Sequence, residues 1–262
     1  MSDFKIVIPA RYASSRLPGK PLIDLAGKPM IQHVFDRAMQ SGASEVVVAT
    51  DDQRIFDVAK AFGADVVMTS PDHENGTERI AEVVTMKGWS DDTVVVNLQG
   101  DEPLIPKSLI ELTANGLLDN TDAGMSSLCT PITTVDDAFD PNSVKVVLNQ
   151  RGFALYFSRA SIPWDRDLYK NGQDELTSKM PVFRHIGMYA YRVAFLRDYQ
   201  NMVACPLELT ESLEQLRALW YGVGIHMSVI DQAPGHGIDT PIDVARVSAI
   251  LQAGLNIQTA LN

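Results

Sequence analysis

Cysteine is scarce in this sequence, and long apolar runs are missing. Two cysteines occur among 262 residues, Cys129 and Cys205, far apart and without the spacing of a metal site. We read both as reduced, structural thiols and expect no disulfide framework. No apolar run approaches the ~20 residues that span a bilayer, and the first residues do not read as a signal peptide. These absences predict a soluble, cytoplasmic protein without a membrane partner.

Positive charge is also in short supply. Lysine and arginine number 22 against 33 acidic residues, which gives a formal net charge of -11 and a pI near 4.8. Such a chain is a poor non-specific binder of nucleic acid, and we expect no nucleic-acid partner. Any polyphosphate ligand would need a local positive field, with metal ions neutralising the rest. Hydrophobic residues make up 45% of the chain, enough for a substantial core.

Strand and helix patterns alternate through the first half of the chain. Continuous apolar runs typical of buried parallel strands occupy residues 5–9, 45–50, 65–69 and 93–98. Amphipathic helical patterns lie between them, at 29–41, 55–62 and from 76 through 84. This alternation predicts an α/β fold, with a Rossmann-like, mostly parallel sheet covered by helices on both faces.

The second half changes character. Residues 143–148 and 153–158 flank a turn-forming stretch and predict a hairpin, followed by a strand at 183–191. Helices are expected at 207–221 and 241–251, with a strand at 225–230 between them. We predict one domain spanning 1–262, with a small antiparallel, hairpin-containing insertion at about 130–200.

The loop after the first strand combines small, polar and cationic residues. Arg11, Arg16 and Lys20 supply charge, while Ser14 and Ser15 are small enough to leave room for a ligand. A strand that leads through such a loop into a helix presents backbone N–H groups to phosphates. The composition of the loop therefore predicts a triphosphate cradle.

This loop carries a family resemblance. The run IPARYASSRLPGKPL, followed by GKPMI, resembles the signature of sugar-activating nucleotidyltransferases. Among them it is most similar to the 3-deoxy-manno-octulosonate (Kdo) cytidylyltransferases, or CMP-Kdo synthetases. The motifs NLQGDEP at 97–103 and GIDTP at 237–241 follow the same pattern.

Two carboxylates in these motifs are candidate metal ligands. Asp101 follows a buried strand and a glycine, where it is well placed to hold a divalent ion beside a phosphate. Asp239, taken alone, reads as a helix cap before Pro241, as does Thr240. The resemblance implies that Asp101 and Asp239 both bind Mg²⁺, and a capping side chain still has a second oxygen for this.

The resemblance also implies which residues handle the nucleotide. CTP would be bound by Ala10, Arg11, Ser14, Ser15, Arg16, Lys20, Gly76, Thr77 and Gln99. Catalysis would rest on Lys20, Arg11, Asp101 and Asp239. The stretch that contains Gly76 and Thr77 resembles a family segment near the cytosine ring, although Asn75 stands where that segment usually has serine.

A third set of motifs suits an acidic sugar. Arg159 lies in FSRASIPWDR, a motif similar to the acceptor side of the Kdo enzymes, and arginine binds carboxylates in bidentate fashion. Strand alternation places His185, Gly187, Tyr189 and Tyr191 on one polar face. The resemblance implies that the sugar is bound by Gln99, Arg159, His185, Tyr189, Glu214 and Gln215.

The function implied by this resemblance is Mg²⁺-dependent transfer of a cytidylyl group from CTP to Kdo. Pyrophosphate would leave, and CMP-Kdo would form for lipopolysaccharide biosynthesis, in a homodimeric enzyme whose insertion carries dimer contacts. Two alternatives stay open. One is a cytidylyltransferase for another 2-keto sugar acid, either 8-amino-Kdo or sialic acid. The other is a catalytically silent nucleotide-binding regulator on the same fold.

Overall fold

The computed structural model describes residues 3–13, 17–73, 75–170, 172–235 and 237–260. The chain divides into two compact units, Met1–Glu111 with Pro234–Asn262, and Leu112–Ala233. The predicted hairpin-containing segment lies in the second unit. In the described ranges, no helix has the length and apolar character needed to cross a membrane.

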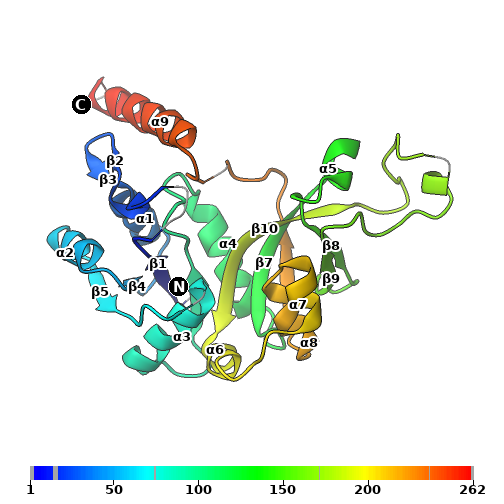
Figure 1. Cartoon of the computed structure of the whole chain (residues 1–262), viewed down its shortest axis with the longest axis horizontal. Coiled ribbons are helices and arrows are strands. Elements are labelled where there is room, and N and C mark those ends of the chain that lie inside the picture. The colour runs from blue at the N-terminus through cyan, green and yellow to red at the C-terminus, as the bar shows by residue number, and fades with distance from the viewer. Residues whose placement is uncertain (1–2, 14–16, 74, 171, 236, 261–262) are drawn as a thin grey trace. The chain divides into compact units, whose positions relative to one another are not determined.

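The first unit is built on parallel strands with helical crossovers (Figure 1). Its elements are β1 (Phe4–Ala10), η1 (Lys20–Leu22), β2 (Asp24–Leu25), β3 (Lys28–Pro29), α1 (Met30–Met39), β4 (Glu45–Thr50), α2 (Gln53–Ala61), β5 (Asp65–Met68), α3 (Gly76–Lys87), β6 (Val94–Asn97) and α9 (Pro241–Ala260). The strand order is β6-β1-β4-β5. The four strands of this parallel sheet lie within one residue of their predicted bounds, and the α/β class is confirmed. The short β2–β3 pair was not predicted.

The order of these strands creates a place for a ligand. The chain runs from β1 outward to β4 and β5, then returns to add β6 on the other side of β1. In open parallel sheets, ligands bind at the carboxyl ends of the two strands where the order reverses. Here those ends are the loops after Ala10 and after Asn97, which carry the predicted nucleotide residues.

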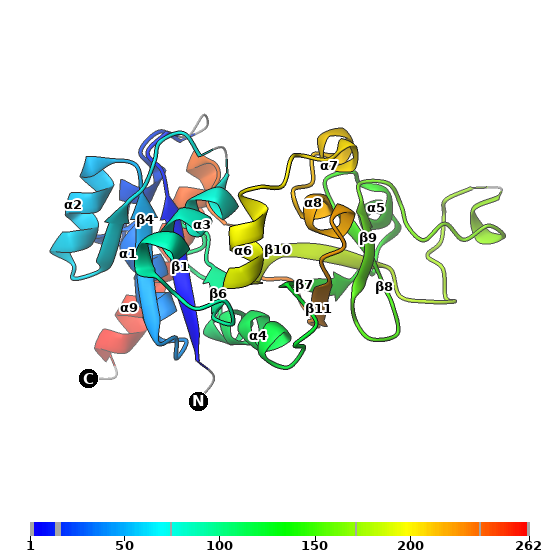
Figure 2. The same ribbon diagram turned by 90° about the horizontal axis from the view of Figure 1, so that it is seen from below.

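The second unit contains a mixed sheet with short helices (Figure 2). Its elements are β7 (Met125–Pro131), α5 (Val135–Phe139), β8 (Lys145–Leu148), β9 (Ala154–Ser158), η2 (Leu168–Lys170), β10 (Phe183–Arg192), α6 (Val193–Tyr199), α7 (Pro206–Glu211), α8 (Gln215–Trp220) and β11 (Ile225–Val229). The α4 helix (Lys107–Leu118) carries the chain from one unit into the other. The β8–β9 pairing confirms the predicted hairpin, and β10 pairs antiparallel with both β7 and β8.

The prediction of one helix over 207–221 is wrong. The segment forms two short helices, α7 and α8, because Ser212 adopts a left-handed conformation with φ 52° and ψ 50°. Leu213 N still donates to Glu208 O at 3.2 Å, which is typical of a helix that ends in the left-handed region. Leu209 is 68% exposed, so the leucine spacing does not mark one continuous buried face.

Candidate functional site

A cavity of about 330 Å³ opens at the carboxyl ends of β1 and β6, and we call it the strand-end pocket. It is lined by strand ends, loops and helix starts of the first unit. They are Pro9, Ala10, Arg11, Ala13, Lys20, Pro21, Met30, His73, Asn75, Gly76, Arg79, Gln99, Gly100, Asp101 and Asp239.

Most of the predicted nucleotide residues line this pocket. Ala10, Arg11, Lys20, Gly76 and Gln99 are all present, together with both candidate metal ligands. Three further predicted residues, Ser14, Ser15 and Arg16, lie outside the described residues. Thr77 is buried in the first turn of α3, beside the pocket rather than among its lining residues.

Lys20 is held at the pocket by a tight loop closure. Gly19 N donates to Tyr12 O at 3.0 Å, and Gly19 has a φ of 71°, which a glycine adopts at little cost. A side chain there would also contact the Tyr12 ring, since an added Cβ would lie 3.0 Å from it. Gly19 therefore shapes the loop that presents Lys20 to the pocket.

The Lys20 ammonium lies between the two candidate metal ligands. Its Nζ is 2.7 Å from Asp101 Oδ2 and 3.0 Å from Asp239 Oδ1. Burial disfavours the charged ammonium, but the hydrogen bonds and charges of both carboxylates outweigh it and raise the pKa of Lys20. Two carboxylates converge on one cation, which is the charge arrangement that a divalent metal ion also requires.

The start of the following helix, α9, does not use the Asp239 carboxylate as its cap. Thr240, and not Asp239, caps α9: Thr240 Oγ1 accepts from Asp243 N at 3.3 Å, and Asp243 Oδ2 accepts from Thr240 N at 3.0 Å. This exchange is a capping box. Because Thr240 performs the capping, the Asp239 carboxylate can turn toward Lys20.

Asn75 caps α3 in the way a serine would. Its Oδ1 accepts from Glu78 N at 2.9 Å, and the first turn of the helix begins at Gly76 on the pocket wall. Serine and asparagine are both favoured caps, so the difference from the family pattern keeps the local structure.

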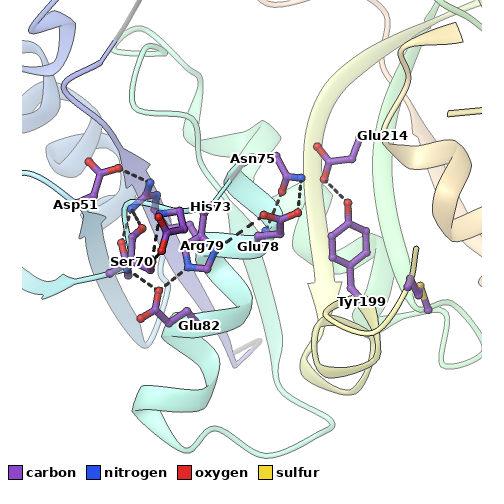
Figure 3. Close-up of polar contacts among 12 residues, drawn as sticks. Asp51, Ser70, His73, Asn75, Glu78, Arg79, Glu82, Tyr199 and Glu214 are labelled. Atoms are coloured by element: carbon purple, nitrogen blue, oxygen red, sulfur yellow. Dashed lines mark hydrogen bonds and ion pairs between the residues drawn. The ribbon is translucent and has the colours of Figure 1, made fainter. Parts of the chain in front are cut away.

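Arg79 and His73 also line the pocket, although neither was predicted as a site residue. Both belong to the stretch that resembles the family segment near the cytosine ring. The Arg79 side chain is 4% exposed and donates to Asp51 Oδ2 at 2.6 Å, and also to Thr69 Oγ1. His73 Nε2 lies 2.5 Å from Glu82 Oε2, as Figure 3 shows. A charged residue on the buried side of a helix was the signal in the sequence that could have marked Arg79.

These contacts brace the loop between β5 and α3. Glu82 Oε2 accepts from Ser70 N at 2.9 Å as well as contacting His73, and Arg79 reaches Ser70 O at 3.4 Å. Asp51 comes from the end of β4, so its ion pair with Arg79 ties that strand to α3. The pocket wall that His73, Asn75, Gly76 and Arg79 form is thus held in place by protein groups.

Glu102, next to Asp101, is a third residue without a predicted role. Burial, reinforced by the charges of Asp101 and Asp239 and opposed by Lys20, raises the pKa of Glu102 to about 7. A carboxyl group that titrates near neutrality therefore adjoins the pocket carboxylates.

The predicted sugar-binding residues other than Gln99 belong to the second unit. On β10, a bulge between Ile186 and Tyr189 accommodates Gly187. The rings of His185 and Tyr189 nevertheless lie 5.4 Å apart, and Tyr189 stacks on Tyr191 at 6.0 Å. The bulge therefore preserves the shared face that strand alternation predicts for these three rings.

Burial governs the ionisation of this face. Desolvation lowers the pKa of His185 to about 3 and raises the pKa of Tyr189. His185 Nε2 lies 2.9 Å from Ser127 Oγ, and its ring packs against Phe157 with centroids 5.0 Å apart. The histidine is thus a neutral hydrogen-bonding group at physiological pH.

Glu214 and Gln215 begin α8, just after the left-handed Ser212. Tyr199 OH donates to Glu214 Oε1 at 3.2 Å (Figure 3). Gln215 is 5% exposed, and its Nε2 has no hydrogen-bond partner among the described residues. A buried amide group without a partner is costly, which points to a ligand or water that completes it.

Arg159 holds the junction between α7 and α8. Its guanidinium donates to Glu211 O at 2.6 Å, Ser212 O at 3.4 Å and Pro141 O at 3.0 Å. Glu211 in turn accepts from Arg159 N at 2.9 Å and from Ser158 Oγ at 2.7 Å. Arg159 therefore joins β9 to the turn that precedes Glu214 and Gln215.

Metal binding by these residues depends on few protein ligands. In the described part of the chain, no group of three or more His, Cys, Asp or Glu side chains could hold an ion. Asp101 and Asp239 form a pair, which fits Mg²⁺, since that ion takes one or two carboxylates and completes its shell with phosphate oxygens and water.

The family model and the similar proteins point to the same family. Residues 5–227 match the family model described as Cytidylyltransferase. The 3-deoxy-manno-octulosonate cytidylyltransferase of Thioalkalivibrio sulfidiphilus is 57% identical over 252 residues, 96% of this chain and 100% of that protein. The enzyme of the same name from Coxiella burnetii is 54% identical over 247 residues, covering 94% and 99% of the two chains.

A solved structure agrees with these relatives. The structure of CMP:2-keto-3-deoxy-manno-octonic acid synthetase complexed with CTP is 43% identical to this chain, with a TM-score of 0.86. It covers 97% of this chain and 100% of its own.

Proposed function

The chain belongs to the family of 3-deoxy-manno-octulosonate cytidylyltransferases, and we propose that its strand-end pocket binds CTP for transfer of the cytidylyl group to that sugar acid, Kdo. The products are CMP-Kdo, an activated sugar for lipopolysaccharide biosynthesis, and pyrophosphate. The observation that carries the proposal is the convergence of Lys20, Asp101 and Asp239 at the ends of β1 and β6.

The pocket suits a nucleoside triphosphate. Arg11 and Lys20 provide positive charge, and the first turn of α3 at Gly76 brings backbone N–H groups to the wall. This local positive charge is needed because the net charge of the chain is negative and would otherwise repel a polyphosphate.

Asp101 and Asp239 are the residues that would hold Mg²⁺. When bound, such an ion would neutralise phosphate charge and lower the pKa of an attacking hydroxyl. The ammonium of Lys20, now shared by the two carboxylates, would then be available to the triphosphate and to the charge that develops on it.

The sugar acid is assigned to the residues of the second unit. The support is the buried Gln215 Nε2, the neutral His185 and the carboxylate of Glu214, all of which are groups that pair with hydroxyls. Arg159 would act through the α7–α8 turn that it holds, and its positive charge suits a substrate with a carboxylate.

Transfer is a direct displacement. The anomeric hydroxyl of Kdo attacks the α-phosphorus of CTP, a new O–P bond forms, and the bond to the pyrophosphate oxygen breaks. The hydroxyl proton is released, and no covalent enzyme intermediate is needed. The residues of this chain contribute alignment and charge neutralisation, which together account for large rate enhancements.

Changing Asp101 to asparagine tests the proposal. Pyrophosphate release by Asp101→Asn should fall about 100-fold or more, on the scale of losing one preorganised electrostatic group, with the melting transition retained. Asp36→Asn is a matched control, since Asp36 pairs with Lys28 at 2.7 Å on the surface. Near-normal release by Asp101→Asn would reject the metal assignment.

The same assay separates the remaining alternatives. Preference for 8-amino-Kdo or sialic acid over Kdo would keep the mechanism and change the substrate. Binding of CTP without turnover of any sugar acid would favour a silent regulator. Homodimerisation and a cytoplasmic location are further proposals, the first supported by the exposed side chains of Leu155 (60%) and Trp164 (54%) in the second unit.

A further inference from the structure

Asp101 and Asp239 come from distant parts of the sequence, yet their carboxylates contact the same ammonium. We propose that Gly237 and Ile238 form a positioning clip that holds Asp239 opposite Asp101, and that a side chain at position 237 would disturb it. The inference rests on the proposed role of the two carboxylates in binding Mg²⁺. It assigns a positioning task to backbone and apolar groups.

The first part of the clip is a backbone hydrogen bond. Ile238 N donates to Asp101 O at 3.0 Å, so the residue before Asp239 is tied directly to the residue that carries the other carboxylate. Because the bond joins the two backbones, it fixes the separation from which both side chains extend. No side-chain substitution at either aspartate removes it.

The second part is the bare backbone at Gly237. A Cβ at this position would lie 2.9 Å from Asp101 O, 3.1 Å from Glu102 Oε1 and 3.3 Å from Glu102 Cδ. Contacts below 3.0 Å are essentially not seen for real Cβ atoms, and Asp101 O is a backbone atom that cannot turn away. The φ of Gly237 lies outside the left-handed region, so the requirement for glycine here is one of space.

The third part fixes the chain on both sides of Asp239. Ile238 is fully buried in an apolar cluster with Leu25, Met30 and Val247. Thr240, on the other side, is locked in the capping box with Asp243. Because Ile238 and Thr240 are both fixed by these contacts, the segment between them has little freedom to adjust. A backbone shift forced at position 237 would therefore move Asp239.

The test compares two glycines that are two residues apart. Gly237→Ala introduces the clash, whereas a Cβ at Gly235 would meet no atom of the described residues within 4 Å, so Gly235→Ala is the matched control. Binding of Mn²⁺, as a paramagnetic substitute for Mg²⁺, is titrated by electron paramagnetic resonance with CTP present and no sugar. We expect about 10-fold weaker Mn²⁺ binding for Gly237→Ala, at the lower end of outer-shell effects on metal affinity, and wild-type binding for Gly235→Ala.

Two further variants make every outcome decisive. Mn²⁺ binding at wild-type strength by a folded Gly237→Ala protein, with weakened binding by Asp101→Asn, would overturn the clip and leave the metal assignment standing. Unchanged binding by Asp101→Asn would instead reject the metal assignment itself. If Gly237→Ala does not melt cooperatively, Ile238→Val decides: it adds no atom, and weaker Mn²⁺ binding supports the clip while unchanged binding overturns it.

Discussion

Removing the hydroxyl of Tyr199 should weaken the use of Kdo without weakening the use of CTP. Tyr199 is 2% exposed, and its OH donates to Glu214 Oε1 at 3.2 Å. Burial, together with the neighbouring Glu214 carboxylate, raises the pKa of Tyr199, so the phenol stays protonated and remains a donor. If Glu214 binds a sugar hydroxyl, this hydrogen bond orients it.

The size of the effect follows from the type of bond. A hydrogen bond to a charged group contributes about 1.5–3 kcal/mol, and about 1.4 kcal/mol corresponds to a factor of ten in an equilibrium. Since the remaining contacts of Glu214 persist, we expect the lower end, about a 10-fold fall in kcat/KM for Kdo. Tyr199→Phe keeps the ring and its packing against Arg217, whose guanidinium lies 4.6 Å from the ring centroid.

The assay is steady-state pyrophosphate release, with each substrate varied in turn. The KM for CTP should stay within about twofold of wild type, because selective loss of Kdo recognition separates positioning from general damage. Tyr221→Phe is the matched control, since Tyr221 is 46% exposed and its hydroxyl contacts Val203. An unchanged kcat/KM for Kdo, or equal losses for both substrates, would show that Tyr199 does not orient Glu214 for the sugar.

Two other predictions test the ion pair behind the pocket and the buried histidine. Asp51→Asn should raise the KM for CTP and lower the free energy of unfolding in urea by about 1–3 kcal/mol. The reason is that Arg79 would keep a buried charge without its counter-ion. An unchanged KM for CTP would mean that Arg79 does not shape the pocket. His185 stays neutral in the folded protein down to a pKa of about 3, whereas the unfolded imidazole protonates below about 6.5, so this residue lowers stability as the pH falls between those values. By linkage, the neutral His185 lowers the free energy of unfolding at pH 5 by about 2 kcal/mol. Between pH 7 and pH 5, the free energy of unfolding in urea should therefore fall less for His185→Asn than for wild type. Equal falls for the two proteins would contradict this role of His185.

The sequence predicted the first unit well because buried parallel strands have a strong pattern. The run Glu45–Thr50 is apolar almost throughout, and the structure gives a strand with those bounds. The strand ends then place Arg11, Gly76, Gln99 and Asp101 around one pocket, since carboxyl ends of parallel strands share an edge.

The break between α7 and α8 could not be predicted in the same way. Leu213 and Leu216 are buried, and their spacing fits a helix. Ser212 nevertheless leaves the helical region, at the point where the Arg159 guanidinium donates to the carbonyl oxygens of Glu211 and Ser212. Arg159 is distant in sequence, so the break depends on a tertiary contact that local periodicity does not contain.

The contacts that brace the pocket wall could not be predicted from local sequence either. The pairing of Arg79 with Asp51, and of Glu82 with His73, joins residues whose separation in sequence carries no pattern. The role of Gly237 is a further case, because the need for glycine arises from the approach of Asp101 O and not from a turn type. Sequence motifs indicated the carboxylates, while tertiary structure showed what holds them.

The most direct measurement is pyrophosphate release by the unaltered protein with CTP, Mg²⁺ and Kdo, with parallel reactions that contain EDTA, 8-amino-Kdo or sialic acid. Turnover with Kdo that EDTA abolishes is the expected result. Turnover that persists in EDTA would contradict the role of Asp101 and Asp239, and CTP binding without release from any sugar acid would contradict cytidylyl transfer itself.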